Sequence, residues 1–240
     1  MGFRNFYTAA ADFFFPPRCL LCRNFLIAPH ETYFCSPCSE ALPLISGPLC
    51  PRCGMPFVSP EGADHLCSRC IGKDPAFDTA RAVGIYAGAL RQAIHLFKYN
   101  SRSLLAAPLG IVLAEQGRGL LEHEHDVIMP VPLHARRIRQ RGFNQSLVLA
   151  RQVGKLWGVA VAAEGLERTR WTAPQTMLHE RQRLRNVRDA FSCRAAAVEK
   201  KSILLVDDVY TSGSTVNECA KVLKRNGARR VDVLTLARTL

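Results

Sequence analysis

The sequence predicts an α/β protein in which helices cover both faces of a parallel sheet, preceded by a small double zinc-ribbon domain. Two observations support this fold class. Eight of the ten cysteines and ten of the fourteen prolines lie before Phe77. Beyond that residue, short apolar runs alternate with amphipathic helical patterns, as they do in parallel sheets covered by helices. We therefore expect a zinc-binding domain over residues 1–76 and a larger domain over residues 77–240.

The composition excludes several classes of protein. Of the 240 residues, 48% are apolar and 22% are charged, which excludes a disordered chain. No apolar run reaches the roughly 18 uncharged residues that a bilayer span needs. Asp12 interrupts the aromatic N-terminal segment and two prolines follow it, so we expect no secretory signal. A cytoplasmic protein without stable membrane insertion is the resulting expectation.

The cysteines before Phe77 form four Cys-x-x-Cys pairs, separated by 12, 11 and 13 residues. Two such turns place four thiolates around one tetrahedral zinc ion, so four turns supply ligands for two ions. Disulfides are the alternative, which the lack of a secretory signal disfavours. The predicted zinc ligands are Cys19, Cys22, Cys35, Cys38, Cys50, Cys53, Cys67 and Cys70.

The spacing of the cysteine pairs leaves their pairing open. In a sequential arrangement, the first two pairs bind one ion and the last two bind the other. In a cross-braced arrangement, the first pair shares an ion with the third, and the second with the fourth. Because this region lacks apolar periodicity, we expect zinc to contribute directly to its folding.

Strand patterns recur along the larger domain. The segment at 79–86 (TARAVGIY) and the segment at 231–237 (VDVLTLA) are predicted strands. A short buried strand is expected at 126–131 (DVIMPV). The continuous apolar run at 202–207 (SILLVD) is typical of a strand buried on both faces. Weaker strand patterns occupy residues 160–168 and 190–194.

Helical patterns alternate with these strands. Residues 89–99 and 104–116 carry apolar residues at helical spacing. An amphipathic helix is predicted at 144–157, and another at 214–225 that Asn226 and Gly227 close. Alternation of this kind favours a parallel sheet with helices on both sides.

One segment carries the chemistry of a phosphorylated-sugar site. The predicted strand at 202–207 delivers two adjacent carboxylates, Asp207 and Asp208, to the edge of the sheet where α/β proteins bind ligands. A hydroxyl-rich turn and a helix start follow, and together they make a phosphate cradle. The carboxylates suit ribose hydroxyls or Mg²⁺. The turn consists of Thr211, Ser212, Gly213, Ser214 and Thr215.

Other motifs with similar elements fit less well. A receiver domain also has an acidic pair after an apolar strand, but it needs further residues on later strands, and only 32 residues follow Asp208. The Gly-x-x-x-x-Gly-Lys of a Walker A loop is absent. An ordinary strand, turn and helix would not combine the acidic pair, the hydroxyls, the glycine and the helix start.

The segment at 203–215 resembles the motif that binds phosphoribosyl pyrophosphate (PRPP) in type I phosphoribosyltransferases. The chain as a whole resembles the ComF (ComFC/GntX) family, in which zinc ribbons precede such a domain. Its four complete cysteine pairs depart from relatives that keep fewer ligands. The supporting stretches are FFPPRCLLC at 14–22, LFKY at 96–99, VPLH at 131–134 and RGFNQ at 141–145.

The resemblance implies a type I phosphoribosyltransferase-like fold, PRPP binding and an association with competence for DNA uptake, in which a helicase-like partner acts on single-stranded DNA. On the matching positions, Asp207 and Asp208 are expected to bind the ribose hydroxyls and, through water, Mg²⁺. The turn at 211–215 is expected to hold the 5′-phosphate. The turn at 130–134 is the expected pyrophosphate loop, and Lys98 or Arg141 would neutralise the leaving group.

The charge is concentrated beside these motifs. Residues 136–188 hold 12 basic and 3 acidic residues, which gives +9 of the formal net charge of +12. Such a block indicates an anionic partner, either a phosphorylated small molecule or a nucleic acid, although a solvated basic surface is the simpler alternative. Within it, the segment at 168–188 matches the place of a mobile lid in related enzymes, or it binds single strands by charge and stacking.

Two functions follow from these features. The first is an enzyme that transfers phosphoribose from PRPP to an acceptor that the sequence leaves unidentified. The second is a non-catalytic adaptor in DNA uptake that senses PRPP and binds single-stranded nucleic acid. The intact PRPP motif favours the first. The lack of a recognisable nucleobase pocket favours the second.

Overall fold

The computed structural model describes residues 16–28, 31–59, 61–99, 103–171 and 186–240. Its main sheet has four strands in the order β1-β6-β5-β2, all parallel to their neighbours, as the sequence predicts. No helix in these described ranges is long and apolar enough to cross a bilayer. The strands are β1 (Thr79–Ile85), β2 (Val127–Pro130), β5 (Ser202–Tyr210) and β6 (Arg230–Arg238).

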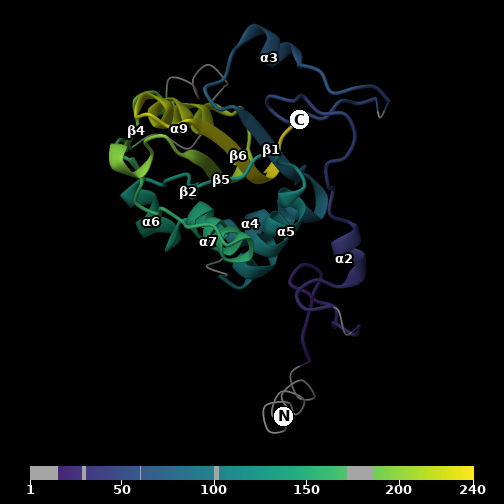
Figure 1. The fold of residues 1–240 in the computed structure, drawn as a ribbon. Helices are drawn as coiled ribbons and strands as arrows, with labels where there is room; N and C mark the ends of the chain where they lie inside the picture. The colour runs from purple at the N-terminus through teal and green to yellow at the C-terminus, as the bar shows by residue number, and fades with distance from the viewer. Residues whose placement is uncertain (1–15, 29–30, 60, 100–102, 172–185) are drawn as a thin grey trace.

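Helices cover both faces of the main sheet (Figure 1). The alternating side chains of β5 explain why, since Leu204 and Val206 belong to one apolar cluster while Ile203 and Leu205 belong to the other. The helices on the first face are α4 (Gly88–Tyr99), α5 (Ala106–Arg118) and α7 (Gln145–Trp157), and α9 (Ser214–Arg225) lies on the second.

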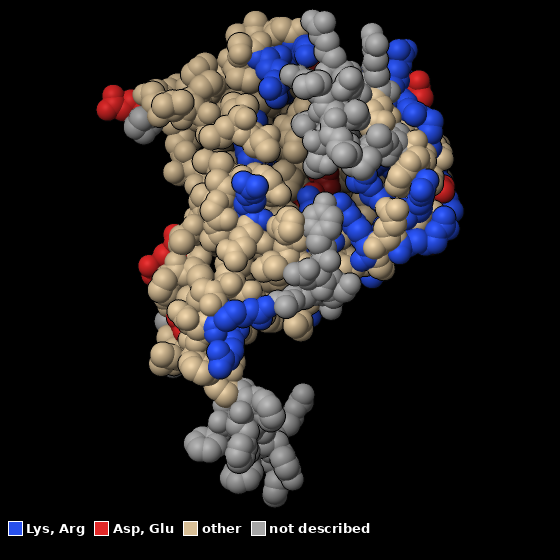
Figure 2. All heavy atoms as spheres, turned by 180° about the vertical axis from the view of Figure 1, so that it is seen from behind, with Lys and Arg blue, Asp and Glu red and all other residues tan. Residues whose placement is uncertain are grey.

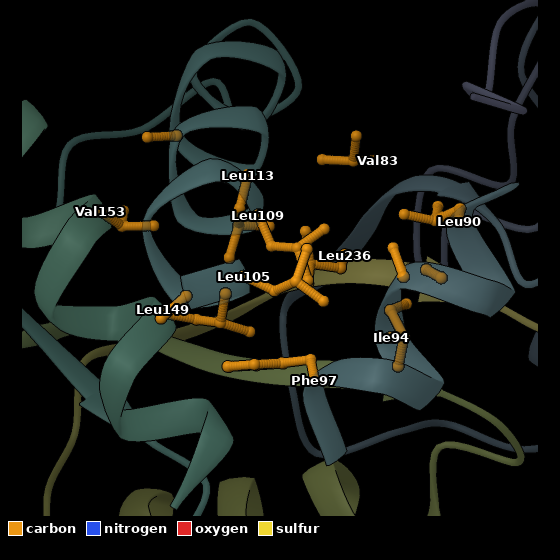
Figure 3. Packing of buried hydrophobic residues seen from close by; sticks show 14 of the residues in the cluster. Val83, Leu90, Ile94, Phe97, Leu105, Leu109, Leu113, Leu149, Val153 and Leu236 are labelled. Carbon is orange, nitrogen blue, oxygen red and sulfur yellow. The ribbon is translucent and has the colours of Figure 1, made fainter. Parts of the chain in front are cut away.

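The first face is held by fully buried aliphatic and aromatic side chains (Figure 3). Leu109 and Leu113 of α5 meet Leu149 of α7 there, and Phe97 of α4 packs below them. The Phe97 ring also lies 5.5 Å from the ring of Phe143, measured between centroids. This packing fixes the last turn of α4 against the sheet.

Several smaller elements were not foreseen or differ from expectation. The weak strand pattern at 160–168 has two outcomes. Its first residues extend the main sheet at β2, where Val161 forms a parallel bridge with Ile128. Its last residues form a separate antiparallel pair with the pattern at 190–194, β3 (Leu166–Arg168) with β4 (Phe191–Cys193). The arginine-rich α6 (Ala135–Arg141) was missed because it has no apolar periodicity. The remaining short helices are α2 (Ser36–Glu40), α3 (Ser68–Gly72), η1 (Ser103–Leu105) and η3 (Ala195–Ala197).

The cysteine-rich region packs against the edge of the sheet and the carboxyl end of β6. The Ile45 amide donates to the Val83 carbonyl (2.9 Å), and the Ile85 amide donates to the Pro43 carbonyl (2.8 Å). These bonds satisfy the outer side of β1, which would otherwise be an open edge. The second contact is made by Arg238, whose side chain is buried. Its guanidinium donates to the Cys53 carbonyl (2.6 Å).

We predict that Arg238→Met weakens this junction. The methionine fills similar space but leaves the Cys53 carbonyl without its donor, so the free energy of unfolding falls by about 1–3 kcal/mol. Urea denaturation measures the change. Arg69→Met is the matched control, because Arg69 is exposed on α3 of the same region, and its unfolding midpoint should stay at the wild-type value. Equal midpoints for wild type and Arg238→Met would contradict the prediction.

Candidate functional site

The acidic pair lies where β5 extends beyond the end of its neighbour β2. The final bond between them runs from the Val131 amide to the Val206 carbonyl (2.9 Å). The strand predicted to end at residue 207 continues to Tyr210, because β6 pairs with it up to Arg238. The next residues of β5, Asp207 and Asp208, therefore line a cavity of about 770 Å³ at the carboxyl edge of the sheet.

Each carboxylate of the pair has a distinct partner. The Ser146 hydroxyl donates to Asp207 Oδ1 (2.8 Å), and Lys98 Nζ lies 2.6 Å from Asp208 Oδ2. Burial and the neighbouring Asp208 charge raise the pKa of Asp207 from 3.8 to about 7. Burial opposes the charge on Lys98, but the ion pair with Asp208 prevails and raises the pKa of Lys98.

The hydroxyl turn forms one wall of the cavity. Gly213 has φ +75°, and a side chain there would collide with the Tyr210 hydroxyl. Helix α9 begins at Ser214, so its N-terminus points its backbone amides at this wall. Ser212 differs from expectation in one respect, since it lines a smaller cavity of about 80 Å³ behind the turn. The turn residues that line the large cavity are Thr211, Gly213, Ser214 and Thr215.

The opposite wall follows β2. It contains the 131–133 loop, Arg137 and Arg141 of α6, and Gln145 at the first position of α7. Lys98 and Arg141 thus lie at the cavity with the acidic pair, as expected. Neither Ser146 nor Gln145 has a predicted role in the sequence, although Gln145 belongs to the RGFNQ stretch at 141–145. Their position at the start of α7, directly after the capping residue Asn144, is the signal that could have found them.

A basic surface with one tryptophan lies at the mouth of the cavity. The Arg136 and Arg137 guanidinium carbons lie 4.9 and 5.8 Å from the centre of the Trp171 ring. Figure 2 shows Lys and Arg side chains gathered at the right of that view. Because the two views differ by a half turn, this side corresponds to the left of Figure 1, where α6 and β4 lie. Most of the segment at 168–188, for which the sequence suggests a lid, lies outside the described residues.

The eight cysteines before Phe77 form two separate clusters. In each, the four sulfur atoms lie within 4.8 Å of one another. A tetrahedral zinc ion with Zn–S bonds of about 2.3 Å needs sulfur atoms about 3.8 Å apart, so both clusters fit zinc. The pairing is sequential and not cross-braced. One site consists of Cys19, Cys22, Cys35 and Cys38, and the other of Cys50, Cys53, Cys67 and Cys70.

Backbone amides prepare these thiols for metal binding. Burial alone would raise the pKa of Cys19 and Cys50, but hydrogen bonds from nearby amides lower it to about 6 and about 7, respectively. A thiolate is the form that binds zinc, so each site contains one thiol that ionises readily. The second site is also close to the hydroxyl turn, because Cys53 and Cys70 line the 80 Å³ cavity together with Ser212.

We predict that Asp207→Asn stabilises the ligand-free protein in a pH-dependent way. Because the pKa of Asp207 is raised to about 7, its contribution to stability is complete below pH 3.8 and is lost as the pH rises through 7. The asparagine keeps the shape without the charge. At pH 8 its melting temperature should exceed that of the wild type by at least about 2–4 °C, and the difference should become smaller as the pH falls through 5 toward 3.8.

Asp208→Asn serves as the comparison for this experiment. It removes the carboxylate that pairs with Lys98 and leaves a buried ammonium without that counter-charge, so it should lower the melting temperature at both pH values. Thermal unfolding followed by circular dichroism gives both numbers. If Asp207→Asn lowered the melting temperature equally at pH 5 and pH 8, the raised pKa would be wrong.

Comparison with known proteins places the chain in a family. A double zinc ribbon domain model matches residues 10–71. The DNA utilization protein YhgH of Escherichia coli K12 is 39% identical over 236 residues, which cover 94% of this chain and 98% of that protein. Competence protein F of Haemophilus influenzae is 32% identical over 232 residues, with the same coverage of 94% and 98%.

A solved structure of the allosteric regulatory enzyme of purine biosynthesis is 24% identical to the chain. The match covers 58% of this chain and 29% of the chain of that enzyme, with a TM-score of 0.40. The full-length match to the two sequence relatives, together with the two clusters of four cysteines and the parallel sheet, confirms the resemblance found in the sequence. The chain belongs to the ComF family, with an N-terminal double zinc ribbon.

Proposed function

We propose that the chain binds PRPP with Mg²⁺ in the 770 Å³ cavity and acts in DNA uptake, as the name of its relative competence protein F suggests. The proposal assigns residues 1–76 to the zinc-binding part and residues 77–240 to the PRPP-binding domain. It also places the protein in the cytoplasm, where thiols stay reduced and available to zinc.

The observation that carries this proposal is the arrangement of charge around the cavity. Donor-rich walls lie on both sides of the two carboxylates, the hydroxyl turn on one side and α6 with the start of α7 on the other. PRPP has the complementary layout, with a 5-phosphate and a diphosphate on either side of a ribose diol. Among the described residues that line the cavity, the cations are Lys98, Arg137, Arg141 and Arg168.

In a phosphoribosyl transfer, different residues of the cavity would stabilise different developing charges. The C1–O bond to the diphosphate breaks, the diphosphate leaves with the electron pair, and an acceptor nucleophile bonds to C1 and loses its proton. Asp207 and Asp208 stabilise the positive charge that develops on the ribose, and Arg141 stabilises the charge on the departing diphosphate. Mg²⁺, held by the two aspartates through water, would neutralise part of the diphosphate charge.

We predict that PRPP with Mg²⁺ binds saturably and that an Asp207→Ala/Asp208→Ala variant loses this binding, because the diol and the metal lose their ligands. Isothermal titration calorimetry on the zinc-loaded protein measures both. Asp78→Ala is the matched control, since Asp78 lines a separate cavity at the opposite edge of the sheet and its removal should leave the affinity unchanged. Wild-type protein that is folded and zinc-loaded but binds no PRPP would disprove the assignment.

The basic surface supports a second function, the binding of single-stranded nucleic acid. Trp171 offers a ring on which a base can stack, and Arg136 and Arg137 lie beside it. This surface is built from α6 and the segment after β3, so it does not depend on the acidic pair. An adaptor without transferase activity would use this surface and keep the cavity as a PRPP sensor, and a helicase-like protein would be its partner in DNA uptake.

We predict that Trp171→Ala weakens the binding of a single-stranded oligonucleotide by about 1–3 kcal/mol, because one stacking platform is lost. Arg136→Ala should lower the slope of log K against log salt by about 0.7, the value for one neutralised phosphate. Fluorescence anisotropy at several salt concentrations measures both. Arg225→Ala, at the far end of α9, is the control with no expected effect. If oligonucleotide binding were lost on replacement of Asp207 and Asp208, the assignment of this binding to the basic surface would be wrong.

A further inference from the structure

The second cysteine cluster is built from two Cys-x-x-Cys turns, and the first of them is joined to the end of β5. This turn spans residues 50–53. Its Cys53 carbonyl accepts a hydrogen bond from the buried guanidinium of Arg238 (2.6 Å). The same guanidinium lies over the ring of Tyr210, the last residue of β5, with its carbon 5.1 Å from the ring centre. A shift of this cysteine turn would therefore move the group that packs on Tyr210.

The other cysteine turn, residues 67–70, is joined to α9 through the segment that follows it. In this segment the Ala76 amide donates to Asn217 Oδ1 (2.7 Å), in the first turn of α9. The next side chain, Phe77, is buried, and its ring meets the edge of the Tyr210 ring with 6.3 Å between centroids. The second cysteine turn thus has its own contacts with the start of α9 and with Tyr210.

Both sets of contacts converge behind the hydroxyl turn. Gly213 turns directly against Tyr210, since a side chain at position 213 would collide with the Tyr210 hydroxyl. Ser212 lines the 80 Å³ cavity between the hydroxyl turn and the cluster, together with Cys53 and Cys70. The remaining residues of the hydroxyl turn line the ligand cavity. The same five residues therefore have the cysteine cluster on one side and the ligand cavity on the other.

The two cysteine turns have little besides a metal ion to hold them together. Among the described residues between 49 and 72, the buried side chains are those of Cys50, Cys53 and Cys67. The Cys53 and Cys67 sulfur atoms lie 3.6 Å apart, and a thiol is only a weak hydrogen-bond donor. Zinc bound to the four thiolates would therefore supply most of the free energy that keeps the two turns in place.

We propose that zinc in the second cysteine cluster controls how strongly the hydroxyl turn binds the phosphate of its ligand. The inference rests on the proposed function and goes beyond it, because it makes PRPP affinity respond to zinc. Loss of this zinc releases the contacts of Arg238 and Ala76, and the hydroxyl turn loses its support. Among the described residues, the first cluster makes no contact with the turn, so its zinc should not affect PRPP.

The test compares one cysteine from each cluster in the full-length protein. Cys70→Ala removes the last thiolate of the second cluster, and Cys38→Ala removes the last thiolate of the first. Both side chains are half-buried, so the two variants are matched. PRPP with Mg²⁺ is titrated calorimetrically into the wild type and both variants. Cys70→Ala should bind PRPP about 5- to 150-fold more weakly, the usual range for two coupled sites, and Cys38→Ala should bind like the wild type.

Zinc affinity gives a second readout, because coupling between two ligands is reciprocal. Competition with a chromogenic zinc chelator measures it. In Cys38→Ala the intact cluster is the second one, and PRPP should raise its zinc affinity by the same factor by which zinc raises the affinity for PRPP. In Cys70→Ala the intact cluster is the first one, and PRPP should leave its zinc affinity unchanged.

Asn217→Ala tests the contact with α9 while the second cluster keeps its four thiolates. In the Cys38→Ala background it removes the acceptor of the Ala76 amide, so PRPP should raise the zinc affinity by a smaller factor. Arg225→Ala is the control, since Arg225 is exposed at the far end of the same helix and should leave the factor unchanged. This pair of variants decides the question if Cys70→Ala does not fold.

Three results would overturn the inference while the proposed function stands. They are wild-type PRPP affinity in folded Cys70→Ala, an equal loss of affinity in both cysteine variants, and zinc affinity of the second cluster that does not respond to PRPP. The second of these would mean that loss of either zinc destabilises the protein in general. If the zinc-loaded wild type bound no PRPP, the proposed function and the inference would both fail.

Discussion

The site depends on a difference in strand length. Strand β2 has four residues and β5 has nine, although the two are neighbours in the sheet. Beyond Pro130 the chain turns away, so two carboxylates of a central strand face open space instead of a neighbouring strand. Burial of Asp207 beside the charge of Asp208 has a cost, which the raised pKa of Asp207 records. The cavity occupies the space beyond the end of β2. Two of its residues, Ser146 and Lys98, hold the two carboxylates in place.

The second zinc cluster belongs to the same arrangement. Arg238 joins the Cys53 carbonyl to the end of β6 and also lies over the Tyr210 ring, with its guanidinium carbon 5.1 Å from the ring centre. That ring is the surface against which Gly213 turns. The second cysteine cluster and the hydroxyl turn, which are far apart in the sequence, are therefore parts of one packed unit. The first cluster has no such route to the turn among the described residues.

Much of this could be predicted from the sequence, and the exceptions have physical causes. The apolar patterns predict all four main strands and the four long helices, because an element buried on one or both faces has apolar residues at a regular spacing. The zinc ligands follow from spacing, but their pairing depends on tertiary packing. Helix α6 leaves no apolar pattern. The role of Lys98 or Arg141 at the diphosphate stays a prediction. The structure adds a contact of Lys98 with Asp208, a partner that only the folded chain brings near it.

The position of β6 has a consequence for how the protein is made. It is the last described element of the chain, yet it lies inside the sheet between β1 and β5. Its register with β1 pairs Thr79 with Asp232, so contacts of very long sequence separation close the sheet. Such contacts fold slowly, and on the ribosome they form only after synthesis has passed β6. The four cysteines of each cluster lie within about 20 residues of one another in the sequence, so metal uptake can precede completion of the sheet during translation.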